Sequence, residues 1–380
     1  MKKTSNAKLN NLKILIIHSE KKFGGGEVHT LELYKNLVKN NININILVVK
    51  KSVLETKLIK EQLPYYTYNQ FSIFKNLIQP GLYFAILKIC NQNNTNIIHC
   101  NIHRETLPAK KVAHKLKIQV ILTRHVTEIP KLKYLKNLDG LIGVNPNIIS
   151  NIKKQNLNIK NYIFIPPFFD ENKFLNFKQS TNKYDFFKTN FNLNIQNIPI
   201  ICTIANIFKS KNHTILLKAV SNLIHKKNKP IEVLLVGDGT QKSKLKFETK
   251  KLNIEKYVHF LGFTNKVTEI LYHSDIKILP SKKEAFGIVL LEAALLKKPL
   301  ICATKTGAAN LIVFDKKTGL LFENNNLDSL IKKIESLLNN TEFCKKLGQN
   351  AYEHTYKIFS VNKNLNKITR FYKKILTEKL

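Results

Sequence analysis

Short apolar runs alternate with longer amphipathic segments along the first half of the chain. The runs cover residues 12–18, 44–49, 96–100, 119–123, 140–144 and 162–166. This alternation is typical of βαβ units, in which helices cover both faces of a parallel sheet. It predicts an α/β fold in which every run is a buried strand.

The same alternation starts again after a polar passage. Residues 176–196 are rich in Asn and Lys and show no clear period, whereas apolar runs return at 199–205, 231–239, 258–263, 276–281, 299–303 and 319–322. We therefore expect two doubly wound, Rossmann-like domains, 1–175 and 197–359, joined by a linker at 176–196. Residues 360–380 have helical spacing and predict a closing helix for the first domain. Ligands bind at the carboxyl ends of such strands, so we expect a cleft between the two domains.

The charge is strongly basic, with a formal net charge of +36 at pH 7. Such a charge suggests an anionic partner, either nucleic acid or a membrane surface. However, base recognition relies on the arginine fork, and Arg104, Arg124 and Arg370 are the only arginines. The lysines are spread along the whole chain, which is typical of solvated faces. No nucleic-acid partner is expected, although a basic nucleic-acid-binding protein stays the alternative that charge alone suggests.

The chain shows no segment that predicts a membrane span. Leu15–Ile17 is too short for the apolar core of a signal peptide, and the apolar stretch from residue 77 is interrupted by Pro80, Gly81 and Lys88. The 5 cysteines lie far apart without a C-x-x-C pair, which indicates buried small hydrophobes in a reducing compartment. These features predict a cytoplasmic protein.

A glycine run follows the first predicted strand. Gly24, Gly25 and Gly26 come after His18, in a turn before a helix predicted to open near Glu27. Glycines let a backbone approach a ligand closely, and a helix start offers free N–H groups to an anion. The spacing does not match the dinucleotide fingerprint G-x-G-x-x-G, and a tight turn alone would explain it equally well.

Two glutamates bracket the most apolar helical stretch, "EAFGIVLLE". On one continuous helix, Glu284 and Glu292 would lie roughly 12 Å apart, too far for the paired carboxylates of a hydrolase. We expect instead that the helix begins near Phe286 or Gly287, so that the N–H groups of Phe286, Gly287 and Ile288 face an anion. Glu284 would then stand at the helix mouth and Glu292 more than a turn inside. Two ordinary glutamates on a core helix are an equally open interpretation of this motif alone.

Six stretches, in this order, resemble the family 4 retaining glycosyltransferases. They are "GGGE", "IPPFFDENKF", "TIANIFKSKN", "LLVGDG", "VHFLGF" and "PSKKEAFGIVLLEAALLKKP", and they extend over nearly the whole chain. The resemblance implies the GT-B fold of two facing Rossmann-like domains. Glu284 and Glu292 match the E-x7-E motif of that family.

The resemblance also implies roles for individual residues. Glu284 would contact the donor sugar, Glu292 the ribose hydroxyls, and Lys211 the donor diphosphate. Asn206 stands where the family has a second cation, an arginine, and Lys209 is the nearest residue to compensate. The further residues implied near the donor are His125, Gly24, Gly25, Gly26, Gly237, Gly262, Phe263, Phe286, Gly287 and Ile288.

On the acceptor side, Arg104 and Arg124 follow the third and fourth long apolar runs. Because arginine is rare in this chain, they suggest recognition of an anionic acceptor group.

A second predicted surface would face a membrane, because apolar residues at helical spacing lie beside lysines and predict an amphipathic face. Its residues are Phe71, Phe74, Lys75, Leu77 and Ile78, with Lys35 and Lys39 on the first helix, although the apolar ones would serve equally to pack on the sheet.

The resemblance therefore implies a retaining, metal-independent transfer of a sugar from a nucleotide-diphosphate sugar to an acceptor hydroxyl. No cofactor is expected, and catalysis rests on stabilising the leaving diphosphate. The acceptor is expected to be a glycan or a lipid-linked glycan of surface polysaccharide or lipopolysaccharide synthesis, at the inner face of the membrane. Asn206 leaves one alternative open, a divergent relative that binds nucleotide without catalysis.

Overall fold

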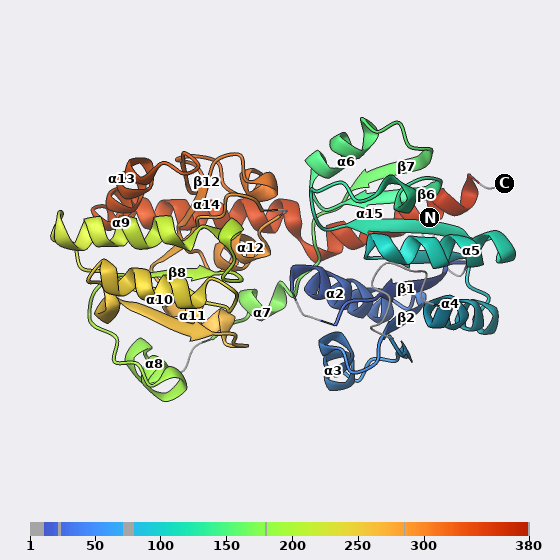
Figure 1. The fold of residues 1–380 in the computed structure, drawn as a ribbon, viewed down its shortest axis with the longest axis horizontal. Helices are drawn as coiled ribbons and strands as arrows, with labels where there is room; N and C mark the ends of the chain where they lie inside the picture. Colours follow the sequence, from blue (N-terminus) through green and yellow to red (C-terminus); the bar gives the residue numbers. More distant parts are fainter. Residues whose placement is uncertain (1–10, 22–23, 71–79, 179–180, 285, 379–380) are drawn as a thin grey trace, which may run out of the picture. The chain divides into compact units, whose positions relative to one another are not determined.

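The computed structural model of the chain describes residues 11–21, 24–70, 80–178, 181–284 and 286–378. It divides into two compact units. The first comprises Met1–Phe169 and Val361–Leu380, and the second comprises Asp170–Ser360. Figure 1 shows that each unit is a sheet with helices on both faces.

The first unit is built on a 7-stranded parallel sheet in the order β3-β2-β1-β4-β5-β6-β7. Its strands are β1 (Lys13–His18), β2 (Asn43–Val49), β3 (Tyr66–Tyr68), β4 (Ile97–Cys100), β5 (Gln119–Arg124), β6 (Leu138–Gly143) and β7 (Ile159–Phe164). Its helices are α2 (Gly25–Lys39), α3 (Val53–Lys60), α4 (Pro80–Gln92), α5 (Thr106–Leu116), α6 (Pro146–Lys153) and α15 (Val361–Thr377), with the short η1 (His103–Glu105) and η2 (Leu132–Tyr134).

Strand β1 shows why both faces of this sheet are covered. Ile14 and Ile16 lie in one core cluster, which α2, α3 and α15 complete, whereas Leu15 and Ile17 lie in the cluster completed by α4, α5 and α6. Successive side chains of a strand point to opposite faces, so an uninterrupted apolar run needs a helical layer on each side.

The second unit repeats this arrangement with a 6-stranded sheet in the order β10-β9-β8-β11-β12-β13. Its strands are β8 (Ile200–Ile204), β9 (Glu232–Val236), β10 (Val258–Gly262), β11 (Ile276–Leu279), β12 (Leu300–Ala303) and β13 (Leu320–Phe322). Its helices are α7 (Asn172–Leu175), α8 (Lys183–Phe191), α9 (His213–His225), α10 (Lys242–Lys251), α11 (Val267–His273), α12 (Ile288–Leu295), α13 (Leu327–Leu338) and α14 (Thr341–Phe359), with η3 (Lys209–Lys211), η4 (Glu255–Tyr257) and η5 (Gly307–Leu311).

The polar passage at 176–196 differs from the expected linker. It contains helix α8 and groups with the second unit, so the chain passes between the units at Phe169 and Asp170. The aromatic side chains of this passage explain the difference. Phe186 lies against His273 with ring centroids 5.0 Å apart, and Phe177 lies against Tyr272 at 5.3 Å. These contacts fasten the passage to α11 and bury its aromatic surface.

The C-terminal helix α15 returns to the first unit, where Ile368, Phe371 and Tyr372 are buried in the core. Tyr372 also contacts the sheet through its hydroxyl, which lies 2.8 Å from Nδ1 of His99. Through the described parts of the chain, none of the helices combines the length and apolar character that a membrane span requires.

Candidate active site

The second unit collects several of the predicted residues at one edge of its sheet. All of its strands are parallel, so the loops after β8, β9, β10 and β11 lie together at their carboxyl ends. Asn206 follows β8 and is exposed, and Gly237 follows β9. Gly262 ends β10, and the side chain of Phe263 beyond it is 75% exposed. Glu284 follows β11. The sheet therefore places segments far apart in the sequence beside one another.

An ion pair joins two residues with predicted roles. Lys211 is the last residue of η3, and its Nζ lies 2.6 Å from Oε2 of Glu284. The side chains are only 20% and 15% exposed. The Ser281 hydroxyl lies 3.4 Å from the same carboxylate oxygen. Lys209, at the start of η3, is exposed. The Glu284 carboxylate thus positions the ammonium group of Lys211.

Helix α12 begins where the sequence predicts. Gly287 is its N-cap residue, with φ +87°, and Ile288 is its first residue. A Cβ on Gly287 would lie 3.2 Å from the Leu279 side chain, so both the left-handed backbone and the limited space favour glycine. Phe286 packs edge-on against Phe359, with ring centroids 5.7 Å apart. This packing fixes the segment that leads into the helix start.

Glu292 lies in the second turn of α12 and is partly buried. Burial raises the pKa of its carboxyl group, and the positive charges of Lys173 and Lys277 act in the opposite direction. Glu284 thus precedes α12 and Glu292 lies within it. The positive charge of lysines from other elements acts on both carboxylates.

Glycine is required at Gly237 because another part of the backbone approaches it closely. The residue has φ +131°, and a Cβ there would lie 2.2 Å from the carbonyl oxygen of Ala205. The Gly237 N–H donates to the carbonyl of Gly262 at 2.8 Å. These contacts bring the ends of β8, β9 and β10 against one another.

In the first unit, the glycine run differs from the expected turn. Helix α2 begins at Gly25 with Gly24 as N-cap, two residues before the predicted start, so Gly25 and Gly26 belong to its first turn. Glu27 is turned toward the sheet, because its Oε1 lies 2.8 Å from Nε2 of His18. Burial acts to raise the pKa of Glu27, but the hydrogen bond and charge of His18 outweigh it and lower the pKa overall.

His125 follows β5 at the carboxyl edge of the first sheet. Its ring lies 4.8 Å from that of His29 and its Nε2 lies 3.5 Å from Oδ1 of Asn101. A Cβ on Gly26 would lie 3.6 Å from the His125 ring, so the glycine run and the histidine are neighbours. Burial lowers the pKa of His125 to about 3, which keeps the imidazole neutral at pH 7.

The two arginines predicted for the acceptor side have protein partners. The Arg124 guanidinium donates to the Glu128 carbonyl at 2.6 Å, and its side chain is buried. Arg104 donates to the Ser19 carbonyl at 3.1 Å and pairs with Glu20 at 3.0 Å. Arg124 therefore organises its own loop, whereas the side chain of Arg104 is 37% exposed and also reaches solvent.

Two further residues at this edge escaped the sequence analysis. Glu105 is fully buried and accepts hydrogen bonds from the N–H groups of Ser19, Asn101 and Ile102, which follow β1 and β4. Burial raises its pKa, although the charge of His18 and the hydrogen bonds from Ile102 and Ser19 act to lower it. His29 accepts from the Phe168 N–H at 3.0 Å through Nδ1, and its buried Nε2 has no partner among the described residues. Glu105 comes soon after the apolar run of β4, which was an available signal, whereas His29 lies inside α2 and gave none.

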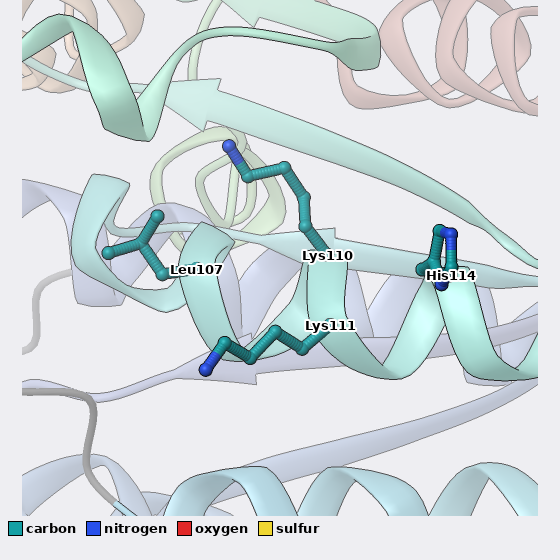
Figure 2. Close-up of a pocket in the computed structure, with 4 residues that line it drawn as sticks. All are labelled: Leu107, Lys110, Lys111 and His114. Carbon is teal, nitrogen blue, oxygen red and sulfur yellow. The ribbon is translucent and has the colours of Figure 1, made fainter.

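Basic side chains also gather on α5 of the first unit. Leu107, Lys110, Lys111 and His114 line a pocket of about 380 Å³ (Figure 2). Lys110 Nζ donates to the carbonyls of Lys133 and Lys136, each at 3.0 Å, which attaches α5 to the η2 segment.

The structure describes only part of the surface that the sequence predicts to face a membrane. Phe71, Phe74, Lys75, Leu77 and Ile78 lie outside the described residues. Of the two lysines on α2, Lys35 pairs with Glu61 at 2.9 Å, and Lys39 lies in the last turn. Over the described ranges, no group of three or more His, Cys, Asp or Glu side chains is arranged to hold a metal ion.

Known proteins resemble both the sequence and the fold. Residues 185–354 match the family model described as glycosyl transferases group 1. N-acetyl-α-D-glucosaminyl L-malate synthase of Bacillus anthracis is 26% identical over 368 residues, which cover 93% of this chain and 95% of that protein. The protein is a glycosyltransferase. The crystal structure of Anabaena HepE in complex with UDP and glucose has a TM-score of 0.82 to this glycosyltransferase, at 19% identity, covering 96% of this chain and 100% of that one.

The two parallel α/β units of this glycosyltransferase form a GT-B fold, as predicted. A third relative matches a smaller part of the enzyme. The N-acetylgalactosamine-N,N'-diacetylbacillosaminyl-diphospho-undecaprenol 4-α-N-acetylgalactosaminyltransferase of Campylobacter jejuni is 26% identical over 151 residues, which cover 40% of each chain.

Proposed function

We propose that this glycosyltransferase transfers a sugar from a uridine diphosphate sugar to an acceptor hydroxyl, with retention of configuration and without a metal ion. The observation that carries the proposal is the Lys211–Glu284 ion pair before the start of α12, with Glu292 in the next turn. A relative bound to UDP supports the nucleotide. The N-acetyl-α-D-glucosaminyl group in the name of another makes UDP-N-acetylglucosamine the first donor to test.

In the proposed donor complex, the diphosphate draws Lys211 away from Glu284. The N–H groups at the start of α12 add positive potential at the phosphates. Glu284 then accepts from sugar hydroxyls and Glu292 from ribose hydroxyls, as the resemblance to family 4 implies. Asn206 contributes no charge at the corresponding edge, so Lys209 is the nearest candidate for a second cation.

The chemical step breaks the bond between the anomeric carbon and the diphosphate oxygen and forms a bond from the acceptor oxygen on the same face of the sugar. The acceptor proton passes to the departing diphosphate oxygen, so no side chain needs to act as a covalent nucleophile. Lys211 and the start of α12 stabilise the charge that develops on this leaving group, and lysine supplies the positive charge that a metal ion would otherwise provide. Neutral His125 is the proposed contact to the donor sugar from the first unit.

We also propose a lipid-linked or polysaccharide acceptor and peripheral attachment to an anionic membrane surface. The undecaprenol diphosphate in the name of one relative supports a lipid-linked acceptor. The lysines of α5 and η2 supply positive charge, and Val126 and Ile129 of the loop after β5 are exposed together with Leu132 of η2. Each lysine near an anionic surface contributes about 1 kcal/mol, so a few of them suffice for salt-sensitive attachment.

Donor binding and transfer test the enzymatic part. Calorimetry against UDP and UDP-sugars should give a saturable signal, and the anomeric configuration of the product should match that of the donor by NMR. Activity should persist in EDTA. Nucleotide binding without donor hydrolysis or transfer would instead favour a non-catalytic binding protein, the alternative that Asn206 suggests.

Sedimentation with vesicles tests the membrane part. We expect recovery with anionic vesicles at low salt, release at high salt, and weaker binding of Lys111→Glu/Lys115→Glu, which reverses two exposed charges of α5. The matched control is Lys244→Glu/Lys246→Glu on α10, which makes the same change in net charge in the other unit. Equal loss in both double variants would show that net charge alone governs binding.

A further inference from the structure

One lysine of the second unit is buried in an unusual position. Lys277 lies in β11, a central strand, paired in register with Cys202 of β8 and Leu300 of β12. Its side chain is fully buried, and its Nζ has no hydrogen-bond partner among the described residues. An ammonium group in such a place costs stability, so packing alone does not explain it.

The face on which Lys277 lies is the one that carries the candidate donor site. Ile276 and Ile278 point into the core cluster on the opposite face of the sheet. Leu279 shares the face of Lys277 and lies close to Gly287, where α12 begins. Helix α12 packs on β11, and the charges of Glu292 and Glu284 both act on Lys277. The lysine thus lies in the strand on which α12 packs, where the charges of both glutamates reach it.

We propose that the Lys277 ammonium is an internal counter-ion that keeps Glu292 ionised when an anionic diphosphate binds. It is a positioning residue, and the proposal rests on the donor site described above. Lys211 is paired with Glu284 in the structure, and in the proposed complex it turns to the phosphates. The phosphates then add negative charge near the two glutamates. Lys277, held within the sheet, still supplies positive charge to them.

The protonation states agree with this arrangement. Burial lowers the pKa of Lys277 to about 8, which leaves the group mainly charged at pH 7. Burial also raises the pKa of Glu292, and the positive charges of Lys173 and Lys277 act to lower it. The titratable or charged groups around the pair come from five other segments: Cys202 of β8, Lys211 of η3, His213 of α9, Lys173 of α7 and Glu284 of the loop after β11.

The direct test is the titration of Glu292 in the ligand-free protein. Carbon-13 NMR of labelled glutamate carboxyl groups, with the signal assigned by Glu292→Gln, gives its pKa in the wild type and in Lys277→Met. We expect the pKa of Glu292 to rise by about one pH unit or more in Lys277→Met. Lys298→Met is the matched control, because its Nζ bonds to the Tyr272 carbonyl, and it should leave this titration unchanged. An unchanged Glu292 in Lys277→Met overturns the proposal.

UDP binding then separates this proposal from the proposed function. Lys277→Met should bind UDP about tenfold more weakly than the wild type at pH 6.5, with a smaller difference at pH 8, because Glu292 regains its charge as the pH rises. In a Glu292→Gln background, Lys277→Met should have no pH-dependent effect. A loss of affinity that does not vary with pH would indicate a purely structural role and contradict the inference. If the wild type binds no UDP, the donor proposal fails, while the carboxyl titration still decides the role of Lys277.

Discussion

Replacing Lys277 by methionine should stabilise the second unit while impairing its site. Burial lowers the pKa of Lys277 from 10.5 to about 8, so below pH 8 the folded protein carries a charge that it disfavours. Each pH unit of difference is worth 1.36 kcal/mol, which gives a cost of about 3 kcal/mol. Methionine has a similar length and no charge, so the free energy of unfolding should rise by about this amount at pH 7.

The stability difference between Lys277→Met and the wild type should change with pH, and the pKa of Lys277 sets the direction of this change. Between pH 8 and 10.5, the unfolded chain binds more protons at Lys277 than the folded one, so the stability of the wild type rises with pH. The advantage of Lys277→Met should therefore be largest at neutral pH and shrink as the pH approaches 10.5. Groups common to both proteins cancel in this comparison.

Scanning calorimetry is the suitable assay, because it resolves the transitions of two units and the chain has no tryptophan for fluorescence. About 3 kcal/mol in a unit of this size corresponds to a rise of roughly 6 to 12 °C in its transition. Lys244→Met, at an exposed lysine of α10, is the control and should leave the same transition nearly unchanged. An unchanged or lower transition for Lys277→Met at pH 7 would refute the argument.

Three other substitutions test the candidate site. Glu292→Ala should weaken UDP-sugar binding by about 1.5 to 3 kcal/mol in calorimetry, since the ribose would lose a charged acceptor; unchanged affinity would reject that role. Lys211→Ala should lower kcat by roughly 10²-fold or more in a transfer assay, and full activity would assign the diphosphate to another base. Gly237→Ala should lower the transition of the second unit more than Gly262→Ala, because only the former places a Cβ against the Ala205 carbonyl; equal shifts would contradict this.

The sequence determined the elements of the fold where a strand is long and apolar on both faces. The predicted run 119–123 corresponds to β5 at Gln119–Arg124, for example, because a buried parallel strand needs apolar residues on successive positions. The three-residue strand β3 was missed, since an edge strand with one buried residue leaves no such run. The passage at 176–196 looked like a linker because its aromatics follow no period, and only their contacts with α11 assign it to the second unit.

For the candidate site too, the sequence predicts some features and the tertiary structure decides the others. The order of motifs and a helix start at Gly287 could be predicted, because glycine and the apolar period are local signals. The pairing of Lys211 with Glu284 and the burial of Lys277 in the strand on which α12 packs depend on how β8, β11 and α12 come together. Within an apolar run a single lysine gives no sign of which face it occupies or what covers it. Electrostatic partners are set by distance in space and by burial, and the tertiary structure alone decides both.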